Sequence, residues 1–395
     1  MASPAKKAKT EGGDNVKVAT ATCASNIAVI KYWGKRDETL LLPINSSLSV
    51  TLDPAQMGTT TTAASCPDWE GDRLWLNGKE EDASAERIQN CLREIRARAG
   101  PGAPKGGLRI VSNNNFPTAA GLASSASGYA CLVAALGYLH DIDGDLSVVA
   151  RQGSGSACRS MYGGFVKWEM GVEADGVDSR AFQTAPESHW PTLHALILVV
   201  SDEKKTVSST GGMTRSVQTS TLLKHRAESV VPGRVAKIEE AIAAKDFEKF
   251  ARITMEESNS FHATCLDTFP PIFYLNDTSR AVIAAVHKIN EAAGRSVAAY
   301  TFDAGPNAVL FMEEVDVPMV ARELAQQFPH GKGSSLEEHI ADADLRAKVL
   351  AAGALTVDPT WAGNVKYFIH SKIGAGPSPQ PVSASLLDPA TGLPK

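Results

Sequence analysis

Residues 115–128 read NFPTAAGLASSASG and lead into an apolar stretch that ends near Leu139. The preceding segment, 107–112, has the composition of a strand, and small apolar residues recur after the run at helical spacing. The sequence therefore predicts a strand, a Gly/Ser loop and a helix in succession. The N-terminus of such a helix has unpaired N–H groups and a positive dipole end, which together bind phosphate. Close packing of the helix against a neighbour accounts for the small residues equally well, so both interpretations stay open at this point.

Within this loop, Gly121 allows the backbone to approach a ligand closely, and Ser124 and Ser125 provide hydroxyls beside the expected free N–H groups. A second stretch, 331–334, reads GKGS but lacks the spacing of a Walker-type phosphate loop. The Gly/Ser loop is therefore the candidate phosphate site.

The composition is that of a globular protein and excludes several classes. The chain has 395 residues, of which 43% are hydrophobic and 21% charged, enough for one large or two moderate cores. Its formal net charge of −5 excludes a general nucleic-acid binder. No apolar run is long enough to cross a bilayer, and we expect residues 1–15, which are polar, to form a disordered tail without a signal core.

The cysteines and histidines show no metal or disulfide pattern. The six cysteines are scattered without a Cys-x-x-Cys pair, which favours reduced thiols and a cytoplasmic location. The nine histidines form no His-Glu-x-x-His or comparable spacing. We therefore expect no structural metal site.

The pattern of the chain predicts two lobes. Short strand-like runs fill residues 16–200, whereas helical stretches dominate from residue 201 onward. We therefore place a first lobe at 16–200 and a second at 201–376, followed by an extended, proline-rich tail at 377–395. Asn-Gly at 77–78 predicts a hairpin turn. Two inward helix faces are expected, formed by Ile88, Cys91, Leu92 and Ile95 and by Ala126, Ala130, Val133 and Ala134.

Cations, hydroxyls and one carboxylate stand at other strand or loop ends. In the segment 25–36, an apolar run is followed by Lys31 and Lys35. These cations suit an anionic ligand, but a simpler explanation is that they extend into water at the end of a strand. The segment 153–160 reads GSGSACRS, in which Arg159 beside two hydroxyls suits a carboxylate or phosphate, although a flexible linker has the same composition. Asp303 precedes Ala-Gly-Pro and is otherwise a turn residue. Taken singly, none of these patterns decides a function.

Taken together, these segments resemble the mevalonate diphosphate decarboxylases, a family within the galactokinase, homoserine kinase, mevalonate kinase and phosphomevalonate kinase superfamily. The resemblance covers almost the whole chain and rests on NIAVIKYWGKRD at 26–37, LPINSSLSVTL at 42–52, RLWLNG at 73–78, NNFPTAAGLASSASG at 114–128, GSGSACRS at 153–160, NSFHATCLDTFPPIFYLNDTS at 259–279 and AYTFDAGPNAVLF at 299–311. The Gly/Ser loop alone indicates only the superfamily. KYWGKRD, GSGSACRS and FHATCLDTFPP are specific to the decarboxylases.

The resemblance implies an α+β, two-lobed fold with the active site in the cleft between the lobes. It implies the ATP-dependent decarboxylation of mevalonate 5-diphosphate to isopentenyl diphosphate, with release of ADP, phosphate and carbon dioxide. The expected cofactors are ATP, as a co-substrate, and magnesium. The expected partners are this small-molecule substrate and a second copy of the chain in a homodimer, with neither nucleic acid nor membrane.

The same resemblance implies roles for particular residues. Asp303 is expected as the catalytic carboxylate near the substrate hydroxyl and Lys31 as its cationic neighbour. Arg159, accompanied by Ser154 and Ser156, is expected to hold the substrate carboxylate. The diphosphate contacts are expected at Tyr32, Lys35, Arg73 and Ser209, and the ATP phosphate contacts, with magnesium, at Gly121, Ser124 and Ser125.

One departure bears on the site. Thr210 stands where some bacterial members of the family have an arginine, so we expect part of the diphosphate contact to come from elsewhere. Two alternatives stay open. A kinase of the same superfamily would stop at the phosphorylated product, and a non-catalytic relative would keep only the fold, although Lys31, Arg159 and Asp303 argue against the latter.

Overall fold

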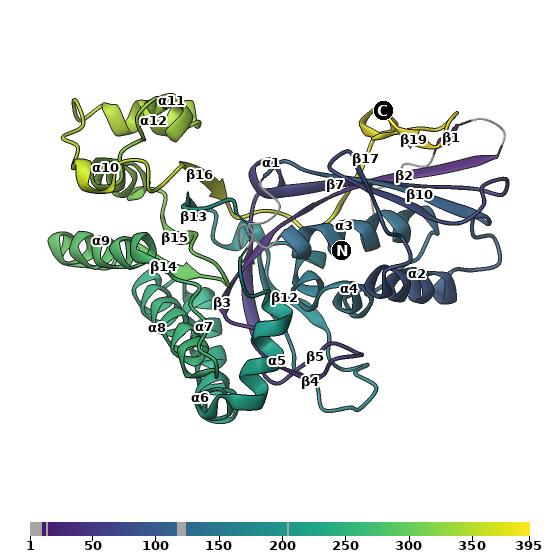
Figure 1. The fold of residues 1–395 in the computed structure, drawn as a ribbon, viewed down its shortest axis with the longest axis horizontal. Coiled ribbons are helices and arrows are strands. Elements are labelled where there is room, and N and C mark those ends of the chain that lie inside the picture. The colour runs from purple at the N-terminus through teal and green to yellow at the C-terminus, as the bar shows by residue number, and fades with distance from the viewer. Residues whose placement is uncertain (1–9, 13–14, 117–123, 204) are drawn as a thin grey trace.

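The computed structural model describes residues 10–12, 15–116, 124–203 and 205–395, which form an α+β architecture with two lobes (Figure 1). The first lobe is built on a seven-stranded sheet. Its strands, in spatial order, are β1 (Thr10–Gly12), β2 (Val16–Ala24), β7 (Gly58–Cys66), β10 (Gly107–Asn114), β8 (Arg73–Leu76) and β9 (Lys79–Glu81), with β17 (Ser378–Gln380) also paired to β2. Asn77 and Gly78 both have positive φ between β8 and β9, which confirms the predicted hairpin.

Three helices cover one face of this sheet: α2 (Glu86–Arg98), α3 (Ser124–Leu139) and α4 (Ser147–Gly153) (Figure 1). The apolar face predicted for α2 is buried, and so is the small-residue face predicted for α3. Small side chains let α3 lie close against β2 and β7. The packing interpretation therefore holds for the part of the Gly/Ser run that lies within α3.

Two four-stranded sheets complete the framework. One contains β12 (Ala181–Ala185), β11 (Phe165–Trp168), β6 (Ser47–Thr51) and β3 (Asn26–Ile30), and the other contains β14 (Ala299–Phe302), β15 (Ala308–Glu313), β13 (Leu193–Val199) and β16 (Tyr367–Lys372). Two short pairs are β4 (Lys35–Asp37) with β5 (Leu42–Pro43) and β18 (Leu387–Asp388) with β19 (Leu393–Pro394).

The remaining helices belong mostly to the second lobe. They are α5 (Ser209–Thr219), α6 (Thr221–His225), a π-helical turn (Arg226–Val230), α7 (Val231–Ala244), α8 (Phe247–Asp267), α9 (Asp277–Ala293), α10 (Val317–Gln327), α11 (Leu336–His339) and α12 (Ala343–Leu350). The short α1 (Pro54–Met57) and a 3-10 helix (Gly155–Met161) lie in the first lobe. No helix in the described part of the chain is long and apolar enough to span a membrane.

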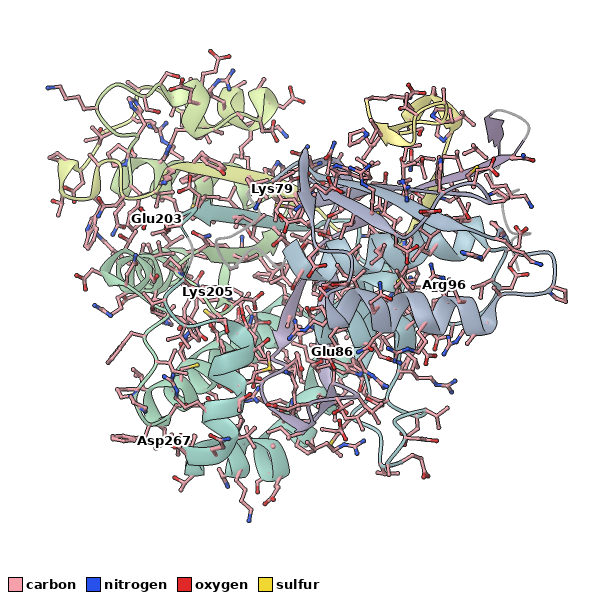
Figure 2. The ribbon with its side chains drawn as sticks, turned by 45° about the vertical axis from the view of Figure 1, so that its right-hand side comes forward. Lys79, Glu86, Arg96, Glu203, Lys205 and Asp267 are labelled. Atoms are coloured by element: carbon pink, nitrogen blue, oxygen red, sulfur yellow. The ribbon has the colours of Figure 1, made fainter. Side chains whose placement is uncertain are left out.

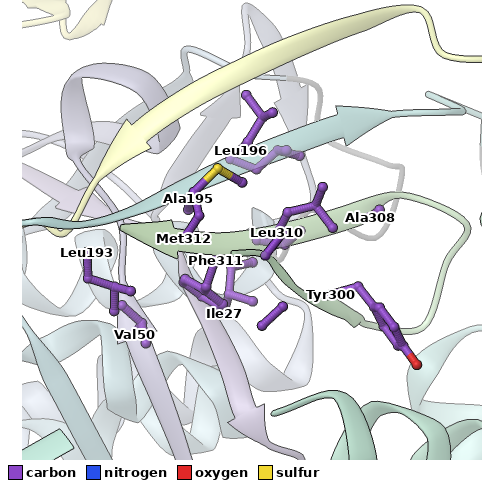
Figure 3. Close-up of a cluster of buried hydrophobic side chains, with 14 of the residues drawn as sticks. Ile27, Val50, Leu193, Ala195, Leu196, Tyr300, Ala308, Leu310, Phe311 and Met312 are labelled. Carbon is purple, nitrogen blue, oxygen red and sulfur yellow. The ribbon is translucent and has the colours of Figure 1, made fainter. Parts of the chain in front are cut away.

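One large hydrophobic core joins the two small sheets (Figure 3). Ile27 of β3 and Val50 of β6 belong to the same buried cluster as Leu193 of β13 and Phe311 of β15. All seven residues of β13 are buried, as expected for a central strand that is covered on both faces. The strand that leads to Lys31 is therefore fixed against the sheet of the second lobe.

The structure differs from the expected organisation at three places. β13, expected at the end of the first lobe, pairs with β15 and β16, so the change of lobe comes before Leu193 rather than at residue 201. Residues 377–395 do not form an extended tail, because β17 pairs with β2 and Leu387 is buried. At the N-terminus β1 pairs with β2, while residues 1–9 and 13–14 of the expected tail lie outside the described residues.

Leu196→Ala should lower the free energy of unfolding by about 2–5 kcal/mol, because this side chain is fully buried in the central strand β13. Urea denaturation followed by circular dichroism would measure the loss. Val172→Ala is the control, since Val172 is 79% exposed and should change stability by less than about 0.5 kcal/mol. Equal stabilities for both variants would contradict the assignment of the shared core.

Candidate active site

A cavity of about 320 Å³ lies where residues of both lobes meet. Most of the predicted site residues line it, namely Lys31, Tyr32, Lys35, Ser124, Ser125, Ser154, Ser156, Arg159, Ser209 and Asp303. They come from the ends of β3 and β14, the starts of β4, α3 and α5, and the 3-10 helix with its N-cap Ser154. Segments far apart in the sequence thus converge on one cavity.

Two predicted residues are not brought to this cavity. Arg73 lies on β8, where it pairs with Glu80 at 2.7 Å and stacks on the ring of Trp75. It is not among the described residues that line the cavity. Gly121 lies outside the described residues.

The cavity carries a large excess of positive charge. Among its described lining residues are five cations, Lys31, Lys35, Arg87, Arg159 and Lys205, and Asp303 is the only carboxylate. Burial lowers the pKa of Lys31, Lys35, Arg159 and Lys205. Like charges at close range repel by several kcal/mol at a protein surface. The lining is therefore complementary to a ligand with several negative charges.

Lys31 and Asp303 form an ion pair at the centre of the site. Lys31 Nζ lies 2.7 Å from Asp303 Oδ1, and the two side chains are 3% and 27% exposed. Lys31 directly follows β3 and Asp303 directly follows β14, so both are strand-end residues as predicted. Burial lowers the pKa of Lys31, whereas the charge of Asp303 raises it. The carboxylate is the more accessible partner and can receive a proton from a ligand.

Arg159 is buried and oriented by neutral acceptors. Its Nε donates to Asn26 Oδ1 at 3.2 Å and its Nη1 donates to Ser47 Oγ at 2.6 Å. Arg159 forms no ion pair with any carboxylate in the described part of the chain. Its charge therefore remains available to an anionic ligand. This geometry fits the carboxylate contact expected of the GSGSACRS segment.

The two serine-containing segments lie side by side. Ser125 Oγ at the start of α3 is 3.3 Å from Ser154 Oγ, which is 3.4 Å from Ser156 Oγ. Gly155 between them lies against Tyr32, where an added Cβ would come within 2.8 Å of the ring. A glycine is thus required here because the phenol occupies the space of a side chain.

Sequence reasoning missed two cations of the site. Lys205, on the segment that joins β13 to α5 (Figure 2), donates from Nζ to Ser209 Oγ at 2.7 Å and to Ala304 O at 3.0 Å. Arg87, on α2, donates from Nη2 to Thr210 Oγ1 at 3.0 Å. Both positions lack a motif of their own, since Lys205 stands in a polar loop and Arg87 at the edge of a helix face. The only signal was Thr210, which suggested that a cation would come from elsewhere.

The cations fall into two groups around the cavity. Asp303 raises the pKa of Lys31, Arg159 and Lys205 against the lowering caused by burial. Burial lowers the pKa of Lys35, and the nearby Arg87 lowers it further. Lys31, Arg159 and Lys205 thus interact with Asp303, whereas Lys35 interacts with another cation of the same cavity.

Comparisons with known proteins give matches over nearly the whole chain. Residues 23–181 match the model of the diphosphomevalonate decarboxylase-like N-terminal domain, and residues 195–380 match that of the mevalonate 5-diphosphate decarboxylase C-terminal domain. The diphosphomevalonate decarboxylase of Rattus norvegicus is 54% identical over 370 residues, which cover 91% of this chain and 92% of that protein. The enzyme of Homo sapiens is 54% identical over 391 residues, 95% of this chain and 97% of that protein.

Solved structures of the same family are also similar to this chain over nearly its whole length. A mevalonate 5-diphosphate decarboxylase crystal structure superimposes with a TM-score of 0.84 at 46% identity, covering 95% of this chain and all of that one. The Trypanosoma brucei enzyme gives 0.85 at 39% identity, covering 94% and 100%. A structure of "MDDEF in complex with MVAPP, AMPPCP and Magnesium" gives 0.74 at 31% identity, covering 93% and 100%.

These matches decide between the alternatives that the sequence left open, because they concern decarboxylases rather than the kinases of the superfamily. They also confirm the two-lobed α+β fold. The chain belongs to the diphosphomevalonate decarboxylase family and is an enzyme that decarboxylates mevalonate 5-diphosphate in the mevalonate pathway.

Proposed function

We propose that the reaction is ATP-dependent, that Asp303 and Lys31 assist phosphoryl transfer to the tertiary hydroxyl, and that Arg159 holds the substrate carboxylate. The products are then isopentenyl diphosphate, ADP, phosphate and carbon dioxide. The observation that carries the proposal is the Lys31–Asp303 pair in a cavity whose other charged side chains are all cationic among the described residues. Such a lining suits two polyanionic substrates that must meet.

Asp303 is proposed as the base for the tertiary hydroxyl. Phosphoryl transfer depends mainly on alignment and on stabilisation of the phosphoryl oxygens, so a well-placed carboxylate can serve as the proton acceptor. Lys31, whose Nζ donates to Asp303 Oδ1 at 2.7 Å, orients the carboxylate before transfer. Lys205, whose Nζ donates to the carbonyl of Ala304 next to Asp303, offsets the charge of the incoming phosphate.

Arg159 is proposed to orient the carboxylate that is lost as carbon dioxide. When the new phosphate leaves, positive charge develops at the tertiary carbon and the C–C bond to the carboxylate supplies the electrons. An arginine that neutralised the carboxylate completely would oppose this step. Arg159 shares its donors with Asn26 and Ser47, so part of its hydrogen-bonding capacity is already used.

Ser124 and Ser125 are proposed as contacts of the ATP phosphates, together with Gly121. Both serines line the cavity at the start of the sixteen-residue helix α3, where phosphate is favoured. The described residues contain no group of three or more His, Cys, Asp or Glu side chains suited to a metal ion. Magnesium is usually held through substrate phosphates with few protein ligands, so these hydroxyls and the phosphates would hold it and it would neutralise phosphate charge.

The substrate diphosphate is proposed to bind Tyr32, Lys35 and Ser209, with Arg87 as an additional contact. All four line the cavity, and Arg87 reaches Thr210 from α2. The diphosphate contact predicted for Arg73 stays a prediction, because Arg73 is paired with Glu80 outside the cavity.

We further propose a cytoplasmic location. All six cysteines are free and buried, which is consistent with a reducing compartment. The expected homodimer stays a prediction.

Asp303→Ala should reduce kcat by roughly 10²–10⁴-fold with little change in the KM for mevalonate 5-diphosphate, because the base acts mainly in the transition state. Carbon dioxide release from carboxyl-labelled substrate would measure it. Asp277→Ala is the control, since that carboxylate is 81% exposed and should leave kcat unchanged. Near-normal turnover by the Asp303 variant would remove this residue from the proposed role.

Arg159→Lys should reduce kcat/KM by about 10- to 100-fold, because an ammonium cannot reproduce the planar donor pair of a guanidinium. Arg93→Lys, on the exposed face of α2, is the matched control. Steady-state kinetics at saturating ATP would separate the two variants. Identical kinetics for both would contradict the carboxylate contact.

Arg87→Ala should raise the KM for mevalonate 5-diphosphate by about 10- to 100-fold and change kcat and the KM for ATP little, because a charge-assisted contact to the diphosphate is lost. Arg93→Ala removes the same charge from the same helix at an exposed position and should have no effect. A KM within twofold of the native value would show that Arg87 does not contact the diphosphate.

A further inference from the structure

The main chain of Lys31 has no partner in the sheet that leads to it. β3 ends at Ile30, and its register with β6 shifts between Ala28 and Ile30. Lys31 itself is 2% exposed. A buried N–H and C=O without partners would cost about as much as two lost hydrogen bonds, so other groups must satisfy them.

Buried side chains, two of them from the second lobe, form hydrogen bonds with the N–H and the C=O of Lys31. The Lys31 N–H donates to Glu257 Oε1 of α8 at 3.0 Å. The Lys31 carbonyl accepts from Arg226 Nη2 at 3.1 Å and from Asn45 Nδ2 at 3.1 Å. Glu257 and Arg226 form an ion pair with side chains 0% and 2% exposed, and Arg234 Nη1 donates to the other oxygen of Glu257 at 2.8 Å.

Ser258, the residue of α8 that follows Glu257, contacts the main chain next to Asp303, the partner of Lys31 in the active-site ion pair. Ser258 Oγ accepts from the N–H of Phe302 at 3.1 Å, and Phe302 directly precedes Asp303. Consecutive residues of one helix therefore bind the backbone at Lys31 and the backbone next to Asp303. Between these two anchored segments, Lys31 Nζ lies 2.7 Å from Asp303 Oδ1.

We propose that Glu257 is a positioning residue for phosphoryl transfer, which together with Ser258 makes α8 the template that aligns Lys31 with Asp303. This inference rests on the roles proposed above for Lys31 and Asp303. Arg226 and Arg234 both form ion pairs with Glu257, so two cations balance the charge of this fully buried side chain.

The charge of Glu257 also acts on the Lys31 ammonium. Burial lowers the pKa of Lys31, Asp303 and Glu257 raise it, and Arg159 lowers it. His262, one turn further along α8, has a pKa lowered to about 3 by burial and by Lys31, so it is neutral at physiological pH. Arg226 faces the Lys31 carbonyl rather than the ammonium. Removal of the negative charge at position 257 therefore lowers the pKa of Lys31, which then loses its proton at a lower pH.

Three variants separate alignment from charge. Glu257→Gln removes the charge and should reduce kcat by about 10- to 100-fold, leave the KM for ATP within twofold and shift the alkaline limb of the kcat profile to lower pH. Glu257→Asp keeps the charge but withdraws the acceptor by one methylene, so kcat should fall without a shift of that limb. Ser258→Ala should reduce kcat because the Phe302 N–H loses its acceptor. Glu256→Gln, at the exposed neighbouring position, should equal the native enzyme.

Thermal unfolding of each variant tests for a structural effect, and the native enzyme is assayed alongside. A folded Glu257→Gln variant with native kcat and an unchanged alkaline limb would overturn the proposal. If that variant does not fold, native kcat in folded Glu257→Asp or Ser258→Ala would overturn it equally. Full turnover by Asp303→Ala would instead refute the roles of the pair, so the two failures are distinguishable.

Discussion

The active site depends on keeping several positive charges close together in one cavity. Each close pair of like charges costs roughly 4 kcal/mol at an effective dielectric constant of about 20. Asp303, the only carboxylate among the described lining residues, forms an ion pair with Lys31, whereas Lys35, Arg87 and Arg159 form no ion pair with it. The fold offsets this repulsion with the hydrophobic core that joins β3 to the sheet of the second lobe. The stability of the hydrophobic core thus keeps the cations close together until anionic substrates bind and neutralise them.

The position of the reactive groups follows from where strands end. Lys31 and Asp303 both stand one residue beyond a buried strand, so their backbones are rigid while their side chains reach the cavity. The helix α8 supplies an acceptor to the N–H of Lys31, which lies beyond the end of β3, and to the N–H of Phe302, the last residue of the edge strand β14. Through these contacts the helix can align the two reactive side chains.

Much of the candidate site could be predicted from the family resemblance, because most of its residues lie in short segments on which that resemblance rests. KYWGK, GSGSACRS and the Asp before Ala-Gly-Pro each form a short segment, and the structure brings them together. Arg87, Lys205 and Glu257 could not be found in this way, because each reaches the site through tertiary contacts from a helix or loop without a motif. Arg73 shows that a residue in a segment typical of the family need not face the cavity. Its side chain pairs with the nearby carboxylate of Glu80 instead. The lobe boundary was missed for a related reason: strand pairing is not encoded in the run of residues that forms β13.

The return of the chain to β2 through β17 has a mechanical consequence. The polypeptide crosses between the lobes before β13 and again after β16, so two covalent connections link them. Two bodies joined at two points rotate most easily about the line through those points, and twisting about other axes stretches a connection. The two connections and the hydrophobic core that the lobes share therefore restrict rotation of one lobe against the other, which keeps the cations of both lobes in a fixed arrangement around the cavity.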